Sequence, residues 1–237
     1  MKFSTCIEKT LKKSSLNTLL VTLLVIPTIA SCSESANSNN AKNAVHIPGQ
    51  RIVDYETARK VFWKELYNKG GKTLYCGETL RSGYNKGVNI EHVFPASWMA
   101  YDLRCGKRKQ CRESSTEFNR IEADLHNLYP SRSDVNKARS NYRFTLIPGE
   151  QRVFAQCDFE FDEKHRIAEP SPAARGRIAR AMLYMSDQHD LYLKRKLESL
   201  LIAWDRKYPP EQVEYRRNDR IEQIQGNRNA FIDAHRN

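Results

Sequence analysis

The sequence predicts an α+β fold, a mainly helical single domain with a few short strands. Two patterns support this class. Apolar residues recur at three- and four-residue spacing near residue 54 and through most of the carboxyl-terminal third, which is typical of helices. Short apolar or alternating segments bounded by glycine and proline, as in residues 87–95, are typical of strands. Residues 51–237 contain no internal repeat and have the size of one domain.

The first half of this domain combines one helix with short strands. Residues 54–70 predict a helix that Gly70 and Gly71 end. Residues 72–80 predict a short strand or a turn, and residues 87–95 predict a strand that ends near Pro95. The polar and basic segment 101–119 is expected to be rich in loops.

The second half is dominated by helices. Ser133 is placed as the amino-terminal cap of a helix that starts near Asp134. Residues 151–161 alternate in polarity and predict a strand. Two longer helices follow, and their apolar stripes are expected to pack in the core: Ile178, Met182 and Met185 on the first, Leu197, Leu200, Leu201 and Trp204 on the second.

Residues 1–32 predict a secretory signal of the lipoprotein type. Four lysines and one glutamate precede an apolar run that Pro27 and several polar residues interrupt, which suits export better than a permanent membrane helix. The ending Ile-Ala-Ser-Cys resembles a bacterial lipobox, in which Cys32 is lipidated; ordinary cleavage near Ala30 or Ser31 is the alternative. Because Ser33 is not aspartate, lipidation predicts an outer-membrane lipoprotein facing the periplasm or the cell surface. Ordinary cleavage predicts a periplasmic or secreted protein.

The exported chain is expected to be basic. Residues 33–50 form a Ser/Asn/Ala-rich tract without apolar periodicity, which predicts a flexible tether. The formal net charge is +11, and residues 1–31 contribute +3 of it, which leaves +8. This charge makes nucleic acid and anionic membrane surfaces plausible partners.

Four cysteines remain after Cys6 and Cys32, and they allow three disulfide connectivities. The short loop between Cys105 and Cys111 makes that pair the easiest to close, which leaves Cys76 with Cys157. Export into an oxidising compartment favours disulfides over a thiolate zinc site.

The chemistry is centred on the dipeptide Glu91-His92. Neighbouring strand residues point to opposite faces, so a bare pair is more often a surface carboxylate and a packed imidazole. A downstream segment changes this interpretation, because carboxylates and amides beside an imidazole suit a magnesium-dependent hydrolase. Within residues 122–141 it supplies Glu122, Asp124, His126, Asn127, Asp134, Asn136 and Asn141.

Residues 89–98, NIEHVFPASW, resemble the WEHVVPAW signature of the bacterial endonuclease I family. Further similar segments follow in the family's order: YCGETL, CGKRKQC, EADLHNLYPS, DVNKARSNY, AQCDF, AEPSPAARGRIARAMLYM and DRIEQIQGNRNAFID. The resemblance extends from about residue 52 to the end. It departs from the family at Ile90, where the family has tryptophan, and in having four rather than eight cysteines.

The resemblance implies a ββα-metal (His-Me finger) catalytic motif. It implies that His92 is the general base, that Glu91 and Asn136 bind one Mg²⁺, and that Arg108 contacts the phosphate. Mn²⁺ or Ca²⁺ would substitute in binding. Glu122, Asp124, His126 and Asn127 match positions with supporting roles.

These observations predict an exported, Mg²⁺-dependent, sequence-nonspecific endonuclease. It would cleave DNA, with RNA open as a second substrate, to 5′-phosphate and 3′-hydroxyl ends. Contacts would go to the phosphate backbone, any membrane contact would be through the lipid, and the protein is expected to be a monomer. A nucleic-acid-binding lipoprotein without catalysis is the alternative. A zinc hydrolase using His92 and His126 is a third reading, although the segment lacks the paired histidine spacing of zincins.

Overall fold

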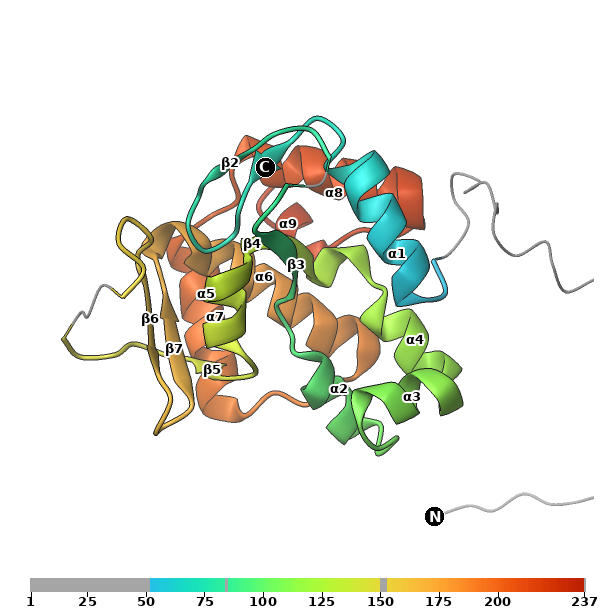
Figure 1. The fold of residues 1–237 in the computed structure, drawn as a ribbon, viewed down its shortest axis with the longest axis horizontal. Helices are drawn as coiled ribbons and strands as arrows, with labels where there is room; N and C mark the ends of the chain where they lie inside the picture. Colours follow the sequence, from blue (N-terminus) through green and yellow to red (C-terminus); the bar gives the residue numbers. More distant parts are fainter. Residues whose placement is uncertain (1–51, 84, 150–152, 237) are drawn as a thin grey trace, which may run out of the picture. The chain divides into compact units, whose positions relative to one another are not determined.

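A computed structural model describes residues 52–83, 85–149 and 153–236, and these residues form one compact unit. The predicted signal segment 1–32, the lipidation site Cys32 and the tether 33–50 lie outside the described residues. The described chain is largely helical with short strands, which confirms the α+β class (Figure 1). None of its helices is long and apolar enough to cross a membrane.

The first half of the described chain contains the elements around the Glu91-His92 pair. Asp54 caps the first helix by accepting a hydrogen bond from the Thr57 amide at 2.8 Å. In chain order the elements are α1 (Tyr55–Val61), the π-helical turn η1 (Phe62–Leu66), β1 (Gly71–Lys72), β2 (Thr79–Leu80), β3 (Val88–His92), α2 (Ala96–Asp102), α3 (Arg108–Ser114), α4 (Thr116–Glu122), the 3₁₀ turn η2 (Leu125–Asn127), β4 (Leu128–Arg132) and α5 (Ser133–Arg139).

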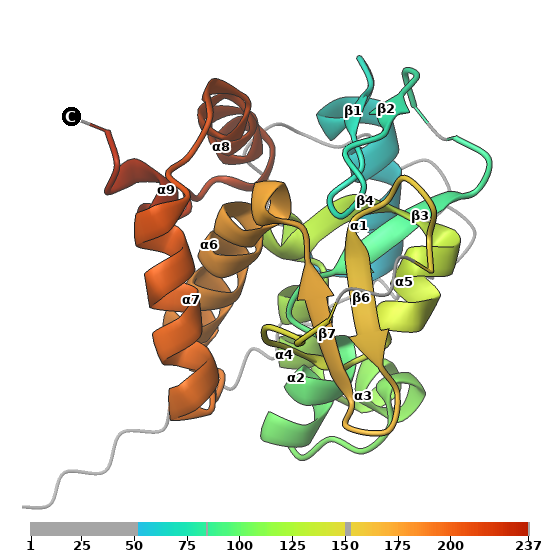
Figure 2. The same ribbon diagram turned by 90° about the vertical axis from the view of Figure 1, so that its left-hand side faces the viewer.

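The second half supplies a small sheet and the larger helices. Its elements are β5 (Arg143–Phe144), β6 (Phe159–Asp162), β7 (Ile167–Pro170), α6 (Pro172–His189), α7 (Arg195–Lys207), α8 (Gln212–Gln225) and α9 (Ala230–Asp233). Strand β7 lies in the middle, antiparallel to β6 and parallel to β5. Figure 2 shows β6 and β7 next to α5 and shows α6 alongside α7.

Strands β3 and β4 and helix α5 form a ββα arrangement. The two strands are antiparallel, with a register that runs from Val88 opposite Arg132 to His92 opposite Leu128, and α5 follows β4 directly. The 35 residues between the strands, 93–127, contain α2, α3, α4 and η2. Figure 1 shows α2, α3 and α4 grouped beyond the His92 end of β3.

The core confirms the predicted helical stripes. Ile178, Met182 and Met185 on α6 are fully buried. On α7, Leu197, Leu201 and Trp204 are buried, and Leu200 is partly buried against the same cluster.

Three local predictions were wrong. Segment 101–119 is mostly helical, because the short helices bury Cys111 and Phe118 in the core and gain stability from tertiary packing that local sequence does not reveal. Ser133 is the first residue of α5 rather than its cap, and Arg132 holds the cap position while pairing with Asp134. In the predicted strand 151–161, residues 153–156 form turns, and β6 begins only at Phe159.

Candidate active site

A cleft of about 500 Å³ lies over the ββα arrangement. The end of β3, the start of α2, the loop that opens α3, and the carboxyl-terminal part of α5 form its walls. Four sequence-predicted residues line it: Glu91, His92, Arg108 and Asn136. The fold therefore brings together groups that are separated by up to 45 positions in the chain.

Glu91 is a buried carboxylate that several donors hold in place. The Tyr75 hydroxyl donates a 2.6 Å hydrogen bond to Glu91 Oε1, and Arg139 Nη1 lies 3.3 Å from the same atom. Burial raises the pKa of Glu91, and the Arg139 charge opposes that rise. Both side-chain contacts fall on Oε1, the backbone of His92 also donates to the carboxylate, and Glu91 lines the cleft.

His92 is oriented by a backbone carbonyl. Its Nε2 lies 3.0 Å from the Glu122 carbonyl oxygen, which can only accept a hydrogen bond. Nε2 therefore carries the proton, and Nδ1 is the unprotonated nitrogen. Burial, together with the nearby charge of Arg108, lowers the pKa of His92 to about 3, so the imidazole is neutral at physiological pH. A neutral ring with a free Nδ1 can accept a proton from water.

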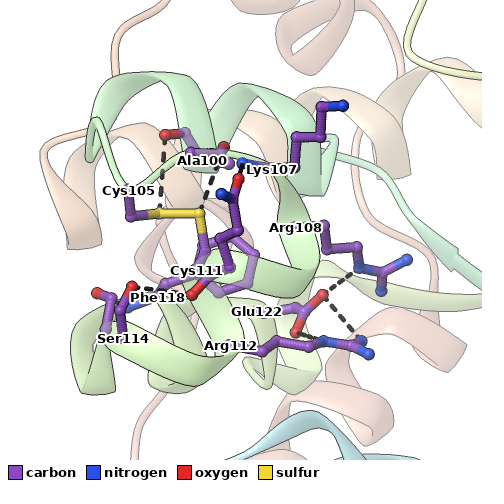
Figure 3. The surroundings of a disulfide bond; sticks show 12 residues. Ala100, Cys105, Lys107, Arg108, Cys111, Arg112, Ser114, Phe118 and Glu122 are labelled. Atoms are coloured by element: carbon purple, nitrogen blue, oxygen red, sulfur yellow. Dashed lines mark hydrogen bonds and ion pairs between the residues drawn. A yellow bond between two sulfur atoms is a disulfide. The ribbon is translucent and has the colours of Figure 1, made fainter.

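Glu122 contacts His92 through its backbone carbonyl and two arginines through its side chain, and Figure 3 shows the two arginine pairs. Its side chain is fully buried and pairs with Nε of Arg108 and with Nε of Arg112, the latter at 2.7 Å. Arg108 contacts Glu122 through Nε, and no hydrogen bond to another described residue engages its two terminal nitrogens, which can form the fork that binds phosphate oxygens. By contrast, the neighbouring Lys109 is almost fully exposed and faces Glu113 at 4.0 Å. The geometry thus singles out Arg108 within the basic segment.

Asn136 is fixed through its amide nitrogen. Nδ2 donates to Asn89 Oδ1 at 2.8 Å and to the Ile90 carbonyl at 3.3 Å. The amide is thereby oriented, and Oδ1 is the atom left for a ligand. Asn136 comes from α5 while Glu91 comes from β3, so two elements of the ββα arrangement offer one oxygen donor each to the cleft.

These donors fit a hard cation. Carboxylate and amide oxygens are the ligands that Mg²⁺ prefers, and Mg²⁺ commonly keeps several waters beside one or two protein ligands. Within the described residues there is no cluster of three or more His, Cys, Asp or Glu side chains suited to a metal. A zinc site that uses His92 and His126 therefore has no counterpart in this part of the chain.

Comparison with known proteins decides the family. The family model described as Endonuclease I matches residues 14–236. The chain belongs to the endonuclease I family. This makes it a nuclease, and its cleft is the candidate active site.

Individual relatives of this endonuclease are also named as nucleases. A periplasmic deoxyribonuclease of Aeromonas hydrophila is 42% identical over 67% of this chain and 69% of its own length. An extracellular deoxyribonuclease of the same organism is 38% identical over 74% of this chain and 86% of its own length. An extracellular ribonuclease of Bacillus amyloliquefaciens is 31% identical over 81% of this chain and 70% of its own length.

Three predicted supporting residues of the endonuclease lie behind the cleft rather than in it. Asn127 donates to the Phe94 carbonyl and accepts from the Phe94 amide at 2.7 Å, which fixes the chain beyond β3. Asp124 accepts hydrogen bonds from Tyr184 and His189. His126 is fully buried. The Asp124 contacts tie the start of η2 to α6.

Sequence reasoning missed four residues that shape the site: Tyr75 and Arg112, described above, and Arg139 and Tyr55. The buried Arg139 donates to the carbonyls of His92 and Val93 as well as to Glu91, so one guanidinium fixes the end of β3. The Tyr55 ring lies with its centroid 5.0 Å from that of His92. Arg139 lies three residues after Asn136, and residues at that spacing share one face of a helix. This spacing was a signal that Arg139 also points toward the site from α5. No comparable signal marked Tyr55, which comes from a separate helix.

Both expected disulfides are present. Cys105 pairs with Cys111, and Cys76 pairs with Cys157. The first encloses Arg108 in its loop, as Figure 3 shows. The second joins the segment that carries Tyr75 to the turn before β6.

Proposed function

We propose that this protein is an exported, Mg²⁺-dependent endonuclease that cleaves nucleic acid with little sequence preference. The observation that carries the proposal is the convergence of Glu91, His92, Arg108 and Asn136 on one cleft, with His92 Nδ1 unprotonated. A protein that only binds nucleic acid has no need for a buried, neutral base beside a buried carboxylate. The convergence therefore favours hydrolysis over the non-catalytic alternative.

The residues of the cleft account for in-line hydrolysis of a phosphodiester. His92 Nδ1 takes a proton from water, whose oxygen forms a bond to phosphorus while the bond to the 3′-oxygen breaks. Arg108 pairs with the non-bridging oxygens as they gain charge. Glu91 and Asn136 would hold Mg²⁺, which supplies positive charge for the phosphate and leaving oxygens when bound. The 3′-oxygen leaves with the bonding electron pair and takes a proton from solvent water, so the products carry a 5′-phosphate and a 3′-hydroxyl.

The substrate is proposed to be DNA, with RNA as a second substrate. Relatives named deoxyribonucleases and ribonucleases both support this range. Phosphate contacts carry no base information, so sequence preference should be weak. We propose that Mn²⁺ can replace Mg²⁺, that Ca²⁺ can occupy the site, and that the protein acts as a monomer.

We further propose that residues 1–32 direct export and that Cys32 carries the lipid, with 33–50 as a tether and 51–237 as the catalytic domain. Relatives named periplasmic and extracellular support export. Two disulfides agree with an oxidising compartment. Palmitate labelling of the expressed chain and of a Cys32→Ser variant tests lipidation, and equal labelling of both would contradict it.

Plasmid nicking by the oxidised protein, with Mg²⁺ and with EDTA, tests the chemistry. His92→Ala is the informative variant, and His235→Ala is the matched control because His235 lies outside the cleft and contacts Asp205 on α7. We expect Mg²⁺-dependent nicking that His92→Ala abolishes and His235→Ala retains, with equal circular dichroism for all three proteins. Tight DNA binding without nicking in any divalent metal would favour the non-catalytic alternative.

A further inference from the structure

Beside the cleft, three polar side chains form a connected row. Asn141 Nδ2 donates to Ser97 Oγ at 3.0 Å, and Arg166 Nη2 donates to Asn141 Oδ1. Ser97 and Asn141 line the cleft. Arg166 comes from the turn between β6 and β7, a separate part of the fold (Figure 2). We propose that this row, Ser97–Asn141–Arg166, is a second phosphate-binding subsite for the substrate backbone.

The hydrogen bonds of the row direct its free donors outward. Ser97 Oγ accepts from Asn141, so its own hydroxyl proton is free to be donated to an anion. Asn141 lies between the other two residues, because its amide nitrogen donates to Ser97 and its oxygen accepts from Arg166. The Arg166 guanidinium has five N–H donors, and Nη2 uses one of them for the hydrogen bond to Asn141. The other N–H groups can bind an anion. A hydroxyl and a guanidinium with free protons match the non-bridging oxygens of a phosphate.

Arg166 is held in place without being neutralised. Its guanidinium carbon lies 5.1 Å from the centroid of the buried Tyr142 ring, a cation–π contact that orients the side chain. No carboxylate among the described residues lies within salt-bridge distance of it, whereas Arg108, Arg132 and Arg175 all have acidic partners. An oriented, exposed cation beside a cleft attracts a polyanion more strongly than one paired with a carboxylate.

The backbone also supports a built subsite. Ser140 adopts φ +51° and lies between the end of α5 and Asn141, and Arg166 adopts φ +53°. Non-glycine residues in this region are strained, and such strain persists where surrounding structure holds it. Both strained positions lie in or beside the row. The chain therefore keeps two unfavourable conformations at the place where Asn141 and Arg166 meet.

This subsite rests on the proposed nuclease function and deepens it. Arg108 would contact the scissile phosphate, and the row would bind another phosphate of the same backbone. Two phosphate contacts on the same backbone would fix the direction of the strand across His92 without reading bases. Losing the row should weaken binding of the ground state and the transition state equally, which raises KM and leaves kcat unchanged.

The salt dependence of binding tests the proposal. Affinity for a fluorescent DNA duplex is measured in Ca²⁺ across a range of KCl, using proteins that all carry His92→Ala to prevent cleavage. The Arg166→Ala change should lower the slope of log K against log salt by about 0.9, the value for one lost phosphate contact on B-DNA. The Arg206→Ala change is the matched control, because Arg206 is exposed on α7 and its loss changes net charge equally.

Two further variants keep the test decisive. Ser97→Ala, at an exposed position, should weaken binding without lowering Tm. In proteins with His92 intact, Arg166→Ala should raise KM for plasmid nicking while kcat stays within about twofold. Equal slopes for Arg166→Ala and Arg206→Ala, or unchanged affinity in Ser97→Ala, would overturn the subsite. Absence of nicking by the unaltered protein would instead contradict the nuclease proposal, and the slopes would still report on the subsite.

Discussion

The two disulfides should contribute differently to stability and to activity. We compare a Cys76→Ala/Cys157→Ala protein with a Cys105→Ala/Cys111→Ala protein. Their partners are 81 and 6 positions apart in sequence. In the chain-entropy model, loops of these lengths correspond to about 4.5 and about 2.2 kcal/mol of unfolding free energy at 25 °C. Loss of the long-range disulfide should therefore destabilise the protein more, by about 2 kcal/mol.

Activity should follow the opposite order. The Cys105–Cys111 loop contains Arg108, whose position on Glu122 depends on how that loop is closed. Opening it should raise KM for DNA and lower kcat even at temperatures where the protein stays folded. The Cys76–Cys157 disulfide reaches the cleft only through the neighbouring Tyr75, which contacts Glu91, so its loss should lower the rate per folded molecule less at 25 °C.

Urea unfolding followed by circular dichroism gives the two free energies, and initial rates of plasmid nicking give the kinetics. Thiol counting confirms the remaining disulfide in each variant. The reasoning is refuted if the Cys105/Cys111 variant is the less stable one, or if it cleaves with the KM and kcat of the unaltered protein. Full reduction of the unaltered protein should lower both stability and activity, and retention of both would contradict a bracing role.

Three further predictions follow from the buried groups around the cleft. Replacing Arg139 by Met leaves the Glu91 carboxylate buried without its cation. The free energy of unfolding in urea should therefore fall by about 3–5 kcal/mol. A fall below about 1 kcal/mol would contradict the pairing. Tyr55→Leu should lower kcat, because it removes the ring that packs against His92. Tyr55→Phe keeps that ring and should have the kcat of the unaltered protein. Equal kcat for the two variants would argue against a role for the contact. The pKa values of His92 and His126 are lowered to about 3 and about 4 in the folded protein, below the ordinary value of 6.5. Between the folded and the unfolded pKa of each histidine, the unfolded chain therefore binds more protons than the folded protein. Stability should therefore fall as pH drops from 7 to 5, by roughly 2 kcal/mol for each histidine, and a urea midpoint independent of pH in this range would refute it.

Local sequence was informative where a pattern depends on near neighbours. The stripe of Ile178, Met182 and Met185 follows from helical periodicity, and the Cys105–Cys111 pair follows from the shortness of its loop. The same reasoning failed for residues 101–119, because two seven-residue helices are too short to be stable alone. Burial of Phe118 and Cys111 in the core stabilises them, and that contact involves distant parts of the chain.

The sequence by itself, through its resemblance to the endonuclease I family, determined which residues are candidates for the site. The resemblance picks out the adjacent Glu91 and His92, the later Asn136, and Arg108 in its basic segment. Only the tertiary structure decided that they line one cleft and what each of them contacts. The carbonyl that sets the tautomer of His92 lies 30 positions away, and the cation beside Glu91 comes from α5. Hydrogen-bond direction and burial depend on which segments the fold brings together, and those distances in space have no counterpart in local sequence.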